Sequence, residues 1–373
     1  MTQVIQTLKN LIAIRSTVDV SNKDIVFYIR QKLQRFESWI YKFKKGDLDL
    51  YNLVVKIKGR RKEDPLIFSG HTDTVLPNEN WTTNPFKAEI TKGKIFGLGS
   101  SDMKGALAAM ITAADQIKQP PTRDVYLFFT ADEEGSALGI KNLMKNIKIK
   151  NGFVILGEPT GFNLRLGHMS VMEMKIIIPG RSGHAALATK DFNRKNNSIY
   201  KAVDIIKFLQ AEEVKLSKIK DKKLGSPLMN IGTIKAGSSV NSIPDKCEMT
   251  VSFRLPPKVN IKNFYQRITE GIKKIAPPAR VEKLFFEDSF LEEENNKNIA
   301  SLKKILKELK IKSKIEYSPA WTEASYLKNI GTCVIIGPGE AKQAHKADEY
   351  IKIDSLLKAV KVYNQIIKAN NLL

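Results

Sequence analysis

Two of the four histidines in this chain lie in short motifs whose acidic side chains could bind metal ions together with them. The motifs are FSGHTDTV, GLGSSDMKG, FFTADEEGS, ILGEPTG and QAHKADEY. The residues in them that could do this chemistry are His71, Asp73, Asp102, Glu133, Glu134, Glu158 and His345. Two imidazoles with three or four carboxylates are the ligands that a pair of zinc-like ions with an open coordination position requires. Together the motifs indicate a metal-dependent hydrolase.

Each candidate by itself also has an ordinary structural explanation. His71 alone could be a histidine that ends a strand, and Asp102 alone could cap the helix that follows it, because aspartate is favoured at that position. Glu133 and Glu134 follow Asp132 directly, and three adjacent acids after a buried strand repel one another unless cations compensate them. The ordered set of motifs therefore favours a metal site over these separate explanations.

The candidate ligands directly follow predicted strands. His71 comes after LIFSG, and Glu158 comes after FVILG. Glu133 and Glu134 come after VYLFFTA. In open α/β sheets, ligands bind beyond the carboxyl ends of the strands, so we expect these side chains at one edge of one sheet.

The pattern of helices and strands predicts an α/β fold in two domains. Alternating elements in the first half are typical of a mixed, largely parallel sheet. Helices are predicted at 2–14, 21–36, 103–118, 136–147, 297–309 and 353–369, and strands at 52–59, 65–70, 124–131, 152–159 and 332–339. This metal-binding domain takes residues 1–169 and 290–373, and a second domain, residues 170–289, is inserted into it.

The inserted domain shows a β-α-β-β-α-β order, which predicts a ferredoxin-like α+β sandwich. Its strands are predicted at 171–178, 229–237, 246–257 and 281–286, and its helices at 198–210 and 261–275. Ile199, Val203, Ile206 and Leu209 form one apolar stripe of the first helix. Alternation along KCEMTVSFR places Arg254 on the solvent face of its sheet.

Composition and charge limit the class of protein. The N-terminus has no secretion signal, and no apolar run in the 373 residues approaches the roughly 18 of a membrane span. Cys247 and Cys333 are far apart in apolar strands, which favours reduced, buried thiols in a cytoplasmic protein. The net charge of +22 comes from lysines without interleaved aromatics, so we expect no nucleic-acid or membrane partner. A lysine-rich proteome, an anionic substrate or an acidic partner would each account for the charge.

The chain resembles the co-catalytic zinc amidohydrolase and exopeptidase family that contains acetylornithine deacetylase, succinyl-diaminopimelate desuccinylase, aminoacylase and carboxypeptidase G. The resemblance rests on GHTDTV, GLGSSDMKG, TADEE, GEPT followed by GHMS, TEASYL and GPGEAKQAHKADEY, and it is nearest to the acetylornithine deacetylase pattern. It covers nearly the full length. It implies a zinc-peptidase-like catalytic domain and an inserted domain that serves as a lid and in dimerisation.

The resemblance implies how the metal ligands are shared. His71 and Glu158 would bind one divalent ion. Glu134 and His345 would bind the other. Asp102 would bridge the two ions and precede a cis peptide bond. Zinc is expected from the ligand types, although cobalt or manganese could be held by the same set.

The resemblance also implies roles for residues that are not ligands. Asp73 would orient the first histidine by accepting its other ring proton, and Glu133 would be the general base. His184 in GRSGHAA would reach the partner's site in a homodimer and polarise the scissile carbonyl, although the proline that the family often has four residues later is absent. Asn241 and Arg254 would hold the substrate, because guanidinium binds a carboxylate through two hydrogen bonds.

The activity implied is removal of an acyl group from the amine of an N-acyl amino acid, with N2-acetylornithine of arginine biosynthesis as the leading substrate. Succinyl-diaminopimelate desuccinylation in lysine biosynthesis is the alternative, followed by dipeptidase or carboxypeptidase activity. We expect a structural role for His168, while Glu323 could contact the substrate or support the ligands. A nucleic-acid-binding protein would predict salt-dependent affinity without a metal requirement, but it has no use for Glu133.

Overall fold

The computed structural model of the protein describes residues 2–369. Its internal contacts divide the chain into two compact units, the second of which interrupts the first. The first unit contains the described residues up to Leu166, Glu292–Glu316 and those from Thr322 onward, and the second contains Gly167–Leu291 and Tyr317–Trp321. The sequence pattern assigned 317–321 to the first unit, because five residues are too few to show which unit they join.

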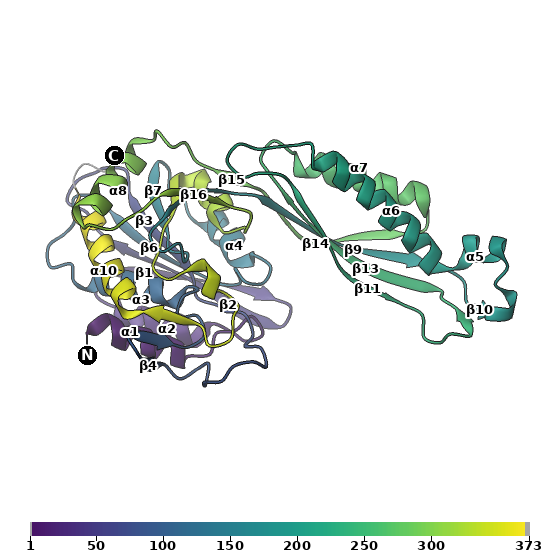
Figure 1. The fold of residues 1–373 in the computed structure, drawn as a ribbon. Helices are drawn as coiled ribbons and strands as arrows, with labels where there is room; N and C mark the ends of the chain where they lie inside the picture. The colour runs from purple at the N-terminus through teal and green to yellow at the C-terminus, as the bar shows by residue number, and fades with distance from the viewer. Residues whose placement is uncertain (1, 370–373) are drawn as a thin grey trace. The chain divides into compact units, whose positions relative to one another are not determined.

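The first unit is built on a mixed sheet with a parallel centre (Figure 1). Its strands run in the order β1-β2-β6-β3-β7-β17-β8, and β6, β3, β7 and β17 are parallel to one another. The strands are β1 (Glu37–Lys45), β2 (Leu48–Ile57), β3 (Leu66–His71), β6 (Val125–Thr130), β7 (Gly152–Leu156), β8 (Leu164–His168), β16 (Ile315–Ser318) and β17 (Gly331–Ile335). The expectation of a mixed sheet with mainly parallel central strands is confirmed.

Helices pack against this sheet and against one another. α1 (Gln3–Ala13), α3 (Lys104–Asp115) and α10 (Ile353–Lys368) pack together, and α4 (Leu138–Asn146) packs against β1, β2 and β6. Further elements are α2 (Lys23–Lys32), α8 (Lys297–Glu308), α9 (Ala324–Leu327) and a small antiparallel sheet of β4 (Glu89–Thr91), β5 (Lys94–Phe96) and β18 (Tyr350–Lys352). In the described part of the chain, no helix has both the length and the apolar character needed to cross a membrane.

One predicted helix is shorter in the structure. The pattern over 21–36 predicted a single helix, but α2 ends at Lys32 and β1 begins at Glu37. In β1, the aromatic residues Trp39, Tyr41 and Phe43 recur at every second position, and this period of two suits a strand rather than a helix. Gly46 makes the turn into β2 with a φ of +57°, a left-handed conformation that glycine adopts without strain.

The second unit is a four-stranded antiparallel sheet with two helices packed on one face (Figure 1). Its elements are β9 (Ser170–Pro179), α6 (Ser198–Leu216), β11 (Leu228–Ala236), β13 (Lys246–Leu255), α7 (Ile261–Ile275) and β14 (Arg280–Glu287). The sheet order β11-β13-β9-β14 is that of a ferredoxin-like sandwich, in agreement with the prediction. Shorter elements are β10 (Gly183–His184), α5 (Lys190–Asn196), β12 (Ser242–Ile243) and β15 (Phe290–Leu291).

The buried face of α6 agrees with the predicted stripe only in part. Leu209 is buried and Ile206 packs against the core of the second unit, as predicted, whereas Ile199 is 37% exposed and Val203 is 42% exposed. Ala202 and Ile205 are buried instead. The helix has apolar residues on two faces, so its sequence alone does not show which face packs on the sheet. α7 has a single apolar face, and that face is buried.

Candidate active site

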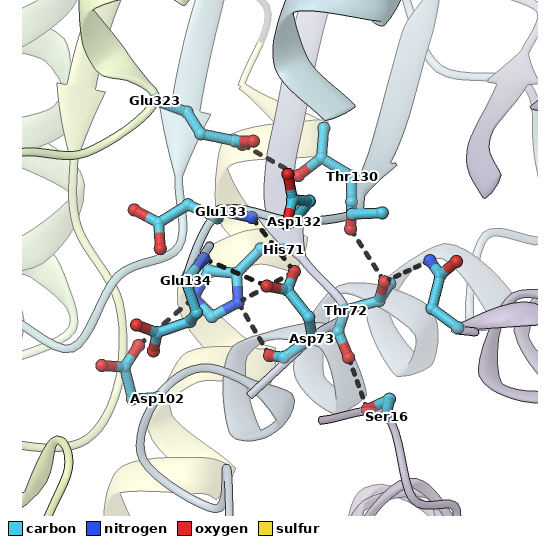
Figure 2. Close-up of polar contacts among 12 residues, drawn as sticks. Ser16, His71, Thr72, Asp73, Asp102, Thr130, Asp132, Glu133, Glu134 and Glu323 are labelled. Atoms are coloured by element: carbon cyan, nitrogen blue, oxygen red, sulfur yellow. Dashed lines mark hydrogen bonds and ion pairs between the residues drawn. The ribbon is translucent and has the colours of Figure 1, made fainter. Parts of the chain in front are cut away.

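The candidate ligands come from five segments of the first unit. His71 is the last residue of β3, Glu134 follows β6, and Glu158 follows β7. These strands are parallel, so their carboxyl ends lie at one edge of the sheet. Asp102 lies in the loop before α3, and His345 lies in the loop before β18. Figure 2 shows the Asp102 carboxylate joined to the His71 ring by a dashed line.

Asp102 lies between two pairs of side chains and presents one carboxylate oxygen to each pair. Its Oδ1 is 3.3 Å from Nε2 of His71, and this nitrogen is 3.8 Å from Oε1 of Glu158. Its Oδ2 is 4.0 Å from Nε2 of His345, which is 2.9 Å from Oε2 of Glu134. The peptide bond after Asp102 is cis. A carboxylate in this arrangement can bridge two ions.

The donor atoms lie close enough together to hold divalent metal ions. Nitrogen and oxygen ligands bind zinc at about 2.0–2.2 Å, which puts two ligands of one tetrahedral ion roughly 3.4 Å apart. Donor atoms of His71, Asp102 and Glu134 all lie within 4.8 Å of one another. Oε1 of Glu158 is buried and has no hydrogen-bond partner among residues 2–369, and a cation would satisfy this oxygen. The donor set therefore fits divalent ions.

The His71 ring is held by a backbone carbonyl, not by the carboxylate that the family resemblance implied. Its Nδ1 is 3.0 Å from the carbonyl oxygen of Asp73, whereas Oδ1 of the Asp73 carboxylate is 3.9 Å away. A ring that donates from Nδ1 keeps the lone pair of Nε2 for a metal ion. The Asp73 carboxylate instead accepts hydrogen bonds from the backbone N–H groups of Glu133 at 3.3 Å and Glu134 at 3.0 Å. Asp73 thus holds the turn that carries the two glutamates, as Figure 2 shows.

The three adjacent acids after β6 have different surroundings. Asp132 has a left-handed φ of +63° and forms an ion pair with Lys45. Its carboxylate also accepts hydrogen bonds from the backbone N–H groups of Ser136 and Leu138, so it is engaged in shaping the turn. The Glu133 carboxylate accepts no hydrogen bond from any described residue. It is therefore the one of the three that can accept a proton from a reactant.

The concentration of buried carboxyl groups changes their pKa values. Burial raises the pKa of Glu133 well above its ordinary value and raises the pKa of Glu158 to about 8. Burial also raises the pKa of Glu134, although its hydrogen bond with His345 opposes the shift. The same hydrogen bond raises the pKa of His345 to about 9. Such a site is stabilised by added positive charge, whether protons or metal ions.

Glu323 is a further buried carboxyl beside the turn after β6 (Figure 2). It is fully buried and accepts a hydrogen bond from the Thr130 hydroxyl at 2.8 Å. Burial raises its pKa to about 8, and the negative charges of Asp73 and Asp132 act in the same direction. Because no part of it is exposed, its contacts support a role in holding the site rather than in touching the substrate.

His184, Asn241 and Arg254 lie in the second unit. The pairing of β10 with β12 brings His184 close to Asn241, whose backbone carbonyl accepts a hydrogen bond from the N–H of Ala185 at 2.9 Å. Arg254 lies on β13, where its Nη2 is 3.5 Å from Oε1 of Glu173. The second unit thus groups two of the three predicted substrate-contacting residues and places the third on a separate strand.

His168 is surrounded by contacts of a structural kind, all within the second unit. Its ring is fully buried, and its Nδ1 is 2.9 Å from the carbonyl oxygen of Met169. The ring also packs against Phe290 and Trp321, with ring centroids 5.6 Å and 6.2 Å away. These contacts favour the structural role.

Sequence reasoning missed two buried charged residues next to the ligands, Lys104 and Glu349. Lys104 donates a hydrogen bond to the carbonyl of Ile14 at 3.0 Å. Burial lowers its pKa to about 7, while its attraction to Glu349 and Asp73 opposes the shift. Lys104 lies inside GLGSSDMKG and next to the apolar run of α3, and a single charge beside such a run is the signal that could have identified it. Glu349 lies inside QAHKADEY, whose other residues are at least partly exposed, so its sequence carries no comparable signal.

Comparison with known proteins adds to this geometry. The model of Peptidase family M20/M25/M40 matches residues 67–369. The acetylornithine deacetylase of Buchnera aphidicola subsp. Schizaphis graminum (strain Sg) is 32% identical, over 81% of this chain and 80% of that protein. The acetylornithine deacetylase of Photorhabdus laumondii subsp. laumondii is 28% identical, over 94% of this chain and 91% of that protein. The structure of the M20 family metallo-carboxypeptidase Sso-CP2 from Sulfolobus solfataricus matches with a TM-score of 0.80 at 16% identity and covers 100% of both chains.

The fold and the ligand cluster define the class of protein, a metal-dependent hydrolase. The family match, which extends over most of the chain, is more specific. The chain belongs to Peptidase family M20/M25/M40 and is a hydrolase that acts on amide bonds. The family resemblance stated from the sequence motifs is thereby confirmed.

Proposed function

We propose that this protein removes the acyl group from the amine of an N-acyl amino acid, with N2-acetylornithine as its substrate. The observation that carries the proposal is the position of Asp102 between two histidine–glutamate pairs, next to the unengaged carboxylate of Glu133. The two relatives described above, both acetylornithine deacetylases, support the choice of substrate and hence a place in arginine biosynthesis. Two buried, unpaired cysteines support a reducing, cytoplasmic location.

In the proposed site, five residues would hold two divalent ions. His71 and Glu158 would hold one ion, Glu134 and His345 would hold the other, and Asp102 would contribute one oxygen to each. Zinc suits the imidazole and carboxylate ligands, and cobalt or manganese could replace it. When bound, such ions polarise the scissile carbonyl and lower the pKa of water at the site.

Glu133 is the proposed general base. It takes a proton from the attacking water and returns it to the leaving amine. The raised pKa of its buried carboxyl suits this exchange, because a base that holds its proton weakly could not deliver it to the amine. The neighbouring acids do not fit the role of general base, because Glu134 is paired with His345 and Asp132 is paired with Lys45.

The second unit supplies the proposed substrate contacts. Arg254 would bind the α-carboxylate with two hydrogen bonds, and Asn241 would hold the substrate beside it. His184 would stabilise the oxyanion in the site of a partner subunit, an effect of about 3–4 kcal/mol for one donor in a comparable role. A homodimer is supported by large apolar side chains left exposed on α6, namely Ile199, Tyr200, Val203 and Val214.

The test compares wild type with Glu133→Ala and a matched control, Glu79→Ala, which removes an exposed acid away from the ligand segments. Each metal-loaded protein is assayed on N2-acetylornithine, N-succinyl-diaminopimelate, acetylmethionine and a dipeptide. We expect wild type and the control to hydrolyse N2-acetylornithine, and we expect Glu133→Ala and chelator-treated wild type to be inactive.

The other outcomes separate the parts of the proposal. Turnover of N-succinyl-diaminopimelate or the dipeptide instead would keep the mechanism and replace the substrate; the net charge of +22 makes the doubly anionic succinyl compound the first replacement. Full activity of Glu133→Ala would refute the assignment of the base. Failure of wild type to bind any metal would refute the two-ion site itself.

A further inference from the structure

Glu349 lies four residues after His345 and reaches back to the loop that carries Asp102. Its Oε1 accepts hydrogen bonds from the backbone N–H groups of Ser101 at 2.7 Å and Asp102 at 2.9 Å. Its Oε2 accepts a hydrogen bond from the N–H of Gly99 at 2.7 Å. One buried carboxylate thus accepts hydrogen bonds from three backbone N–H groups of the loop before α3.

Strand pairing explains why Glu349 stands at this position. β18 pairs with β5 in the antiparallel register that sets Tyr350 opposite Phe96. One step beyond this pair, the N–H of Gly97 donates to the backbone carbonyl of Glu349 at 2.9 Å. The ladder therefore ends where the loop 97–102 begins, and the Glu349 side chain lies over that loop. The buried ammonium group of Lys104 attracts the Glu349 carboxylate.

The preceding residue anchors the same segment on its other side. The Asp348 carboxylate accepts hydrogen bonds from the backbone N–H groups of Thr82 and Thr83 at 3.0 and 3.1 Å, and from the Thr82 hydroxyl at 2.6 Å. His345 is mostly exposed and lies in a left-handed conformation with a φ of +60°. Its position therefore depends on the anchoring of the residues that follow it.

We propose that Glu349 is a positioning residue that fixes the Asp102 loop onto the His345 segment, so that both oxygens of Asp102 face their ion positions. This inference rests on the proposed two-ion site. Asp102 and His345 come from distant parts of the sequence, and Glu349 is bonded to the backbone of the first while it belongs to the segment of the second. Without it, Asp102 is no longer held between the two histidine–glutamate pairs.

The test uses Glu349→Gln, because glutamine has nearly the same shape but only one acceptor oxygen. Whichever way its amide is turned, its NH2 group faces at least one backbone N–H of the loop. Glu340→Gln is the matched control: Glu340 lies in the same segment, but its carboxylate pairs with the surface residues Lys342 and Lys352. Zn²⁺ affinity and stoichiometry are measured by competition with a chelator, and folding by circular dichroism.

We expect Glu349→Gln to fold and to bind at least one Zn²⁺ about 10–100-fold more weakly than wild type, because replacing residues that hold metal ligands in place commonly has effects of this size. We also expect kcat to fall by a larger factor than KM changes. We expect Glu340→Gln to match wild type. The inference is overturned if Glu349→Gln binds two Zn²⁺ with wild-type affinity, or if Glu340→Gln weakens binding as much.

A second variant covers the case in which Glu349→Gln does not fold. Glu349→Asp keeps the charge but is one methylene shorter, so it cannot span the distance to all three N–H groups. It must also weaken Zn²⁺ binding, and a folded Glu349→Asp with wild-type affinity would overturn the inference. Wild type that binds no Zn²⁺ at all would instead refute the proposed function, so the two failures are distinguishable.

Discussion

In the proposed two-ion site, replacing Asp73 with asparagine should weaken binding of the ion at Glu134 and displace the proposed base Glu133. It should leave the orientation of His71 intact. The His71 ring is held by the backbone carbonyl of Asp73, and this carbonyl remains in Asp73→Asn. The carboxylate that is lost holds the backbone N–H groups of Glu133 and Glu134. The asparagine side chain has a single acceptor oxygen, so it can accept a hydrogen bond from one of these two N–H groups. Its NH2 group then faces the other N–H group.

The expected magnitude follows from the lost hydrogen bond. A hydrogen bond to a charged group contributes about 1.5–3 kcal/mol. Since about 1.4 kcal/mol corresponds to a factor of ten, loss of one such bond would weaken binding at the Glu134 position roughly 10–150-fold. The same displacement moves Glu133, so kcat should fall beyond the effect of metal depletion. Binding at the His71 and Glu158 position should change little.

The assay is a Zn²⁺ titration of Asp73→Asn alone and combined with Glu134→Ala or Glu158→Ala. If Asp73 acts through Glu134, adding Asp73→Asn to Glu134→Ala has little further effect on the ion that remains, because the two changes remove the same interaction. Added to Glu158→Ala, it should weaken the remaining ion by the full factor. The opposite pattern would mean that the carboxylate acts on His71 after all, and the reasoning from the 3.9 Å separation would be refuted.

Two further predictions concern Glu323 and His184. The metal-free protein should gain stability from Glu323→Gln at pH 8 but not at pH 4.5. The pKa of Glu323 is raised from 4.5 to about 8 in the folded protein. The contribution of protonated Glu323 to the free energy of unfolding is therefore fully present below pH 4.5 and is lost as the pH rises through 8. Thermal unfolding of both proteins at the two pH values measures this, and an equal difference at both would contradict it. Mixed dimers of His184→Ala and Glu133→Ala, each inactive alone, should regain roughly a quarter of wild-type activity if His184 acts in the partner's site, because half of the dimers then contain one intact site. Co-refolding followed by an activity assay tests this, and no recovery would place His184 in the site of its own subunit.

Much of the fold could be predicted from the sequence because periodicity reflects burial directly. The runs VYLFFT and FVIL are apolar throughout, as buried central strands are, and α7 carries its apolar residues on one face only. Predictions were less accurate where a segment fits two structures. Residues 33–36 continued a helical pattern but form the turn between α2 and β1. α6 has apolar residues on two faces, only one of which packs on its sheet.

The sequence by itself determined which residue types are available and that His71, Glu134 and Glu158 follow strands, because a buried apolar run and its end are local signals. Only the tertiary structure decided that Asp102 faces both histidines, since its loop and that of His345 meet through contacts between distant segments. It also decided that the Asp73 carbonyl, not its carboxylate, holds His71. Such distinctions of about one ångström depend on backbone path and packing, which no motif spacing specifies.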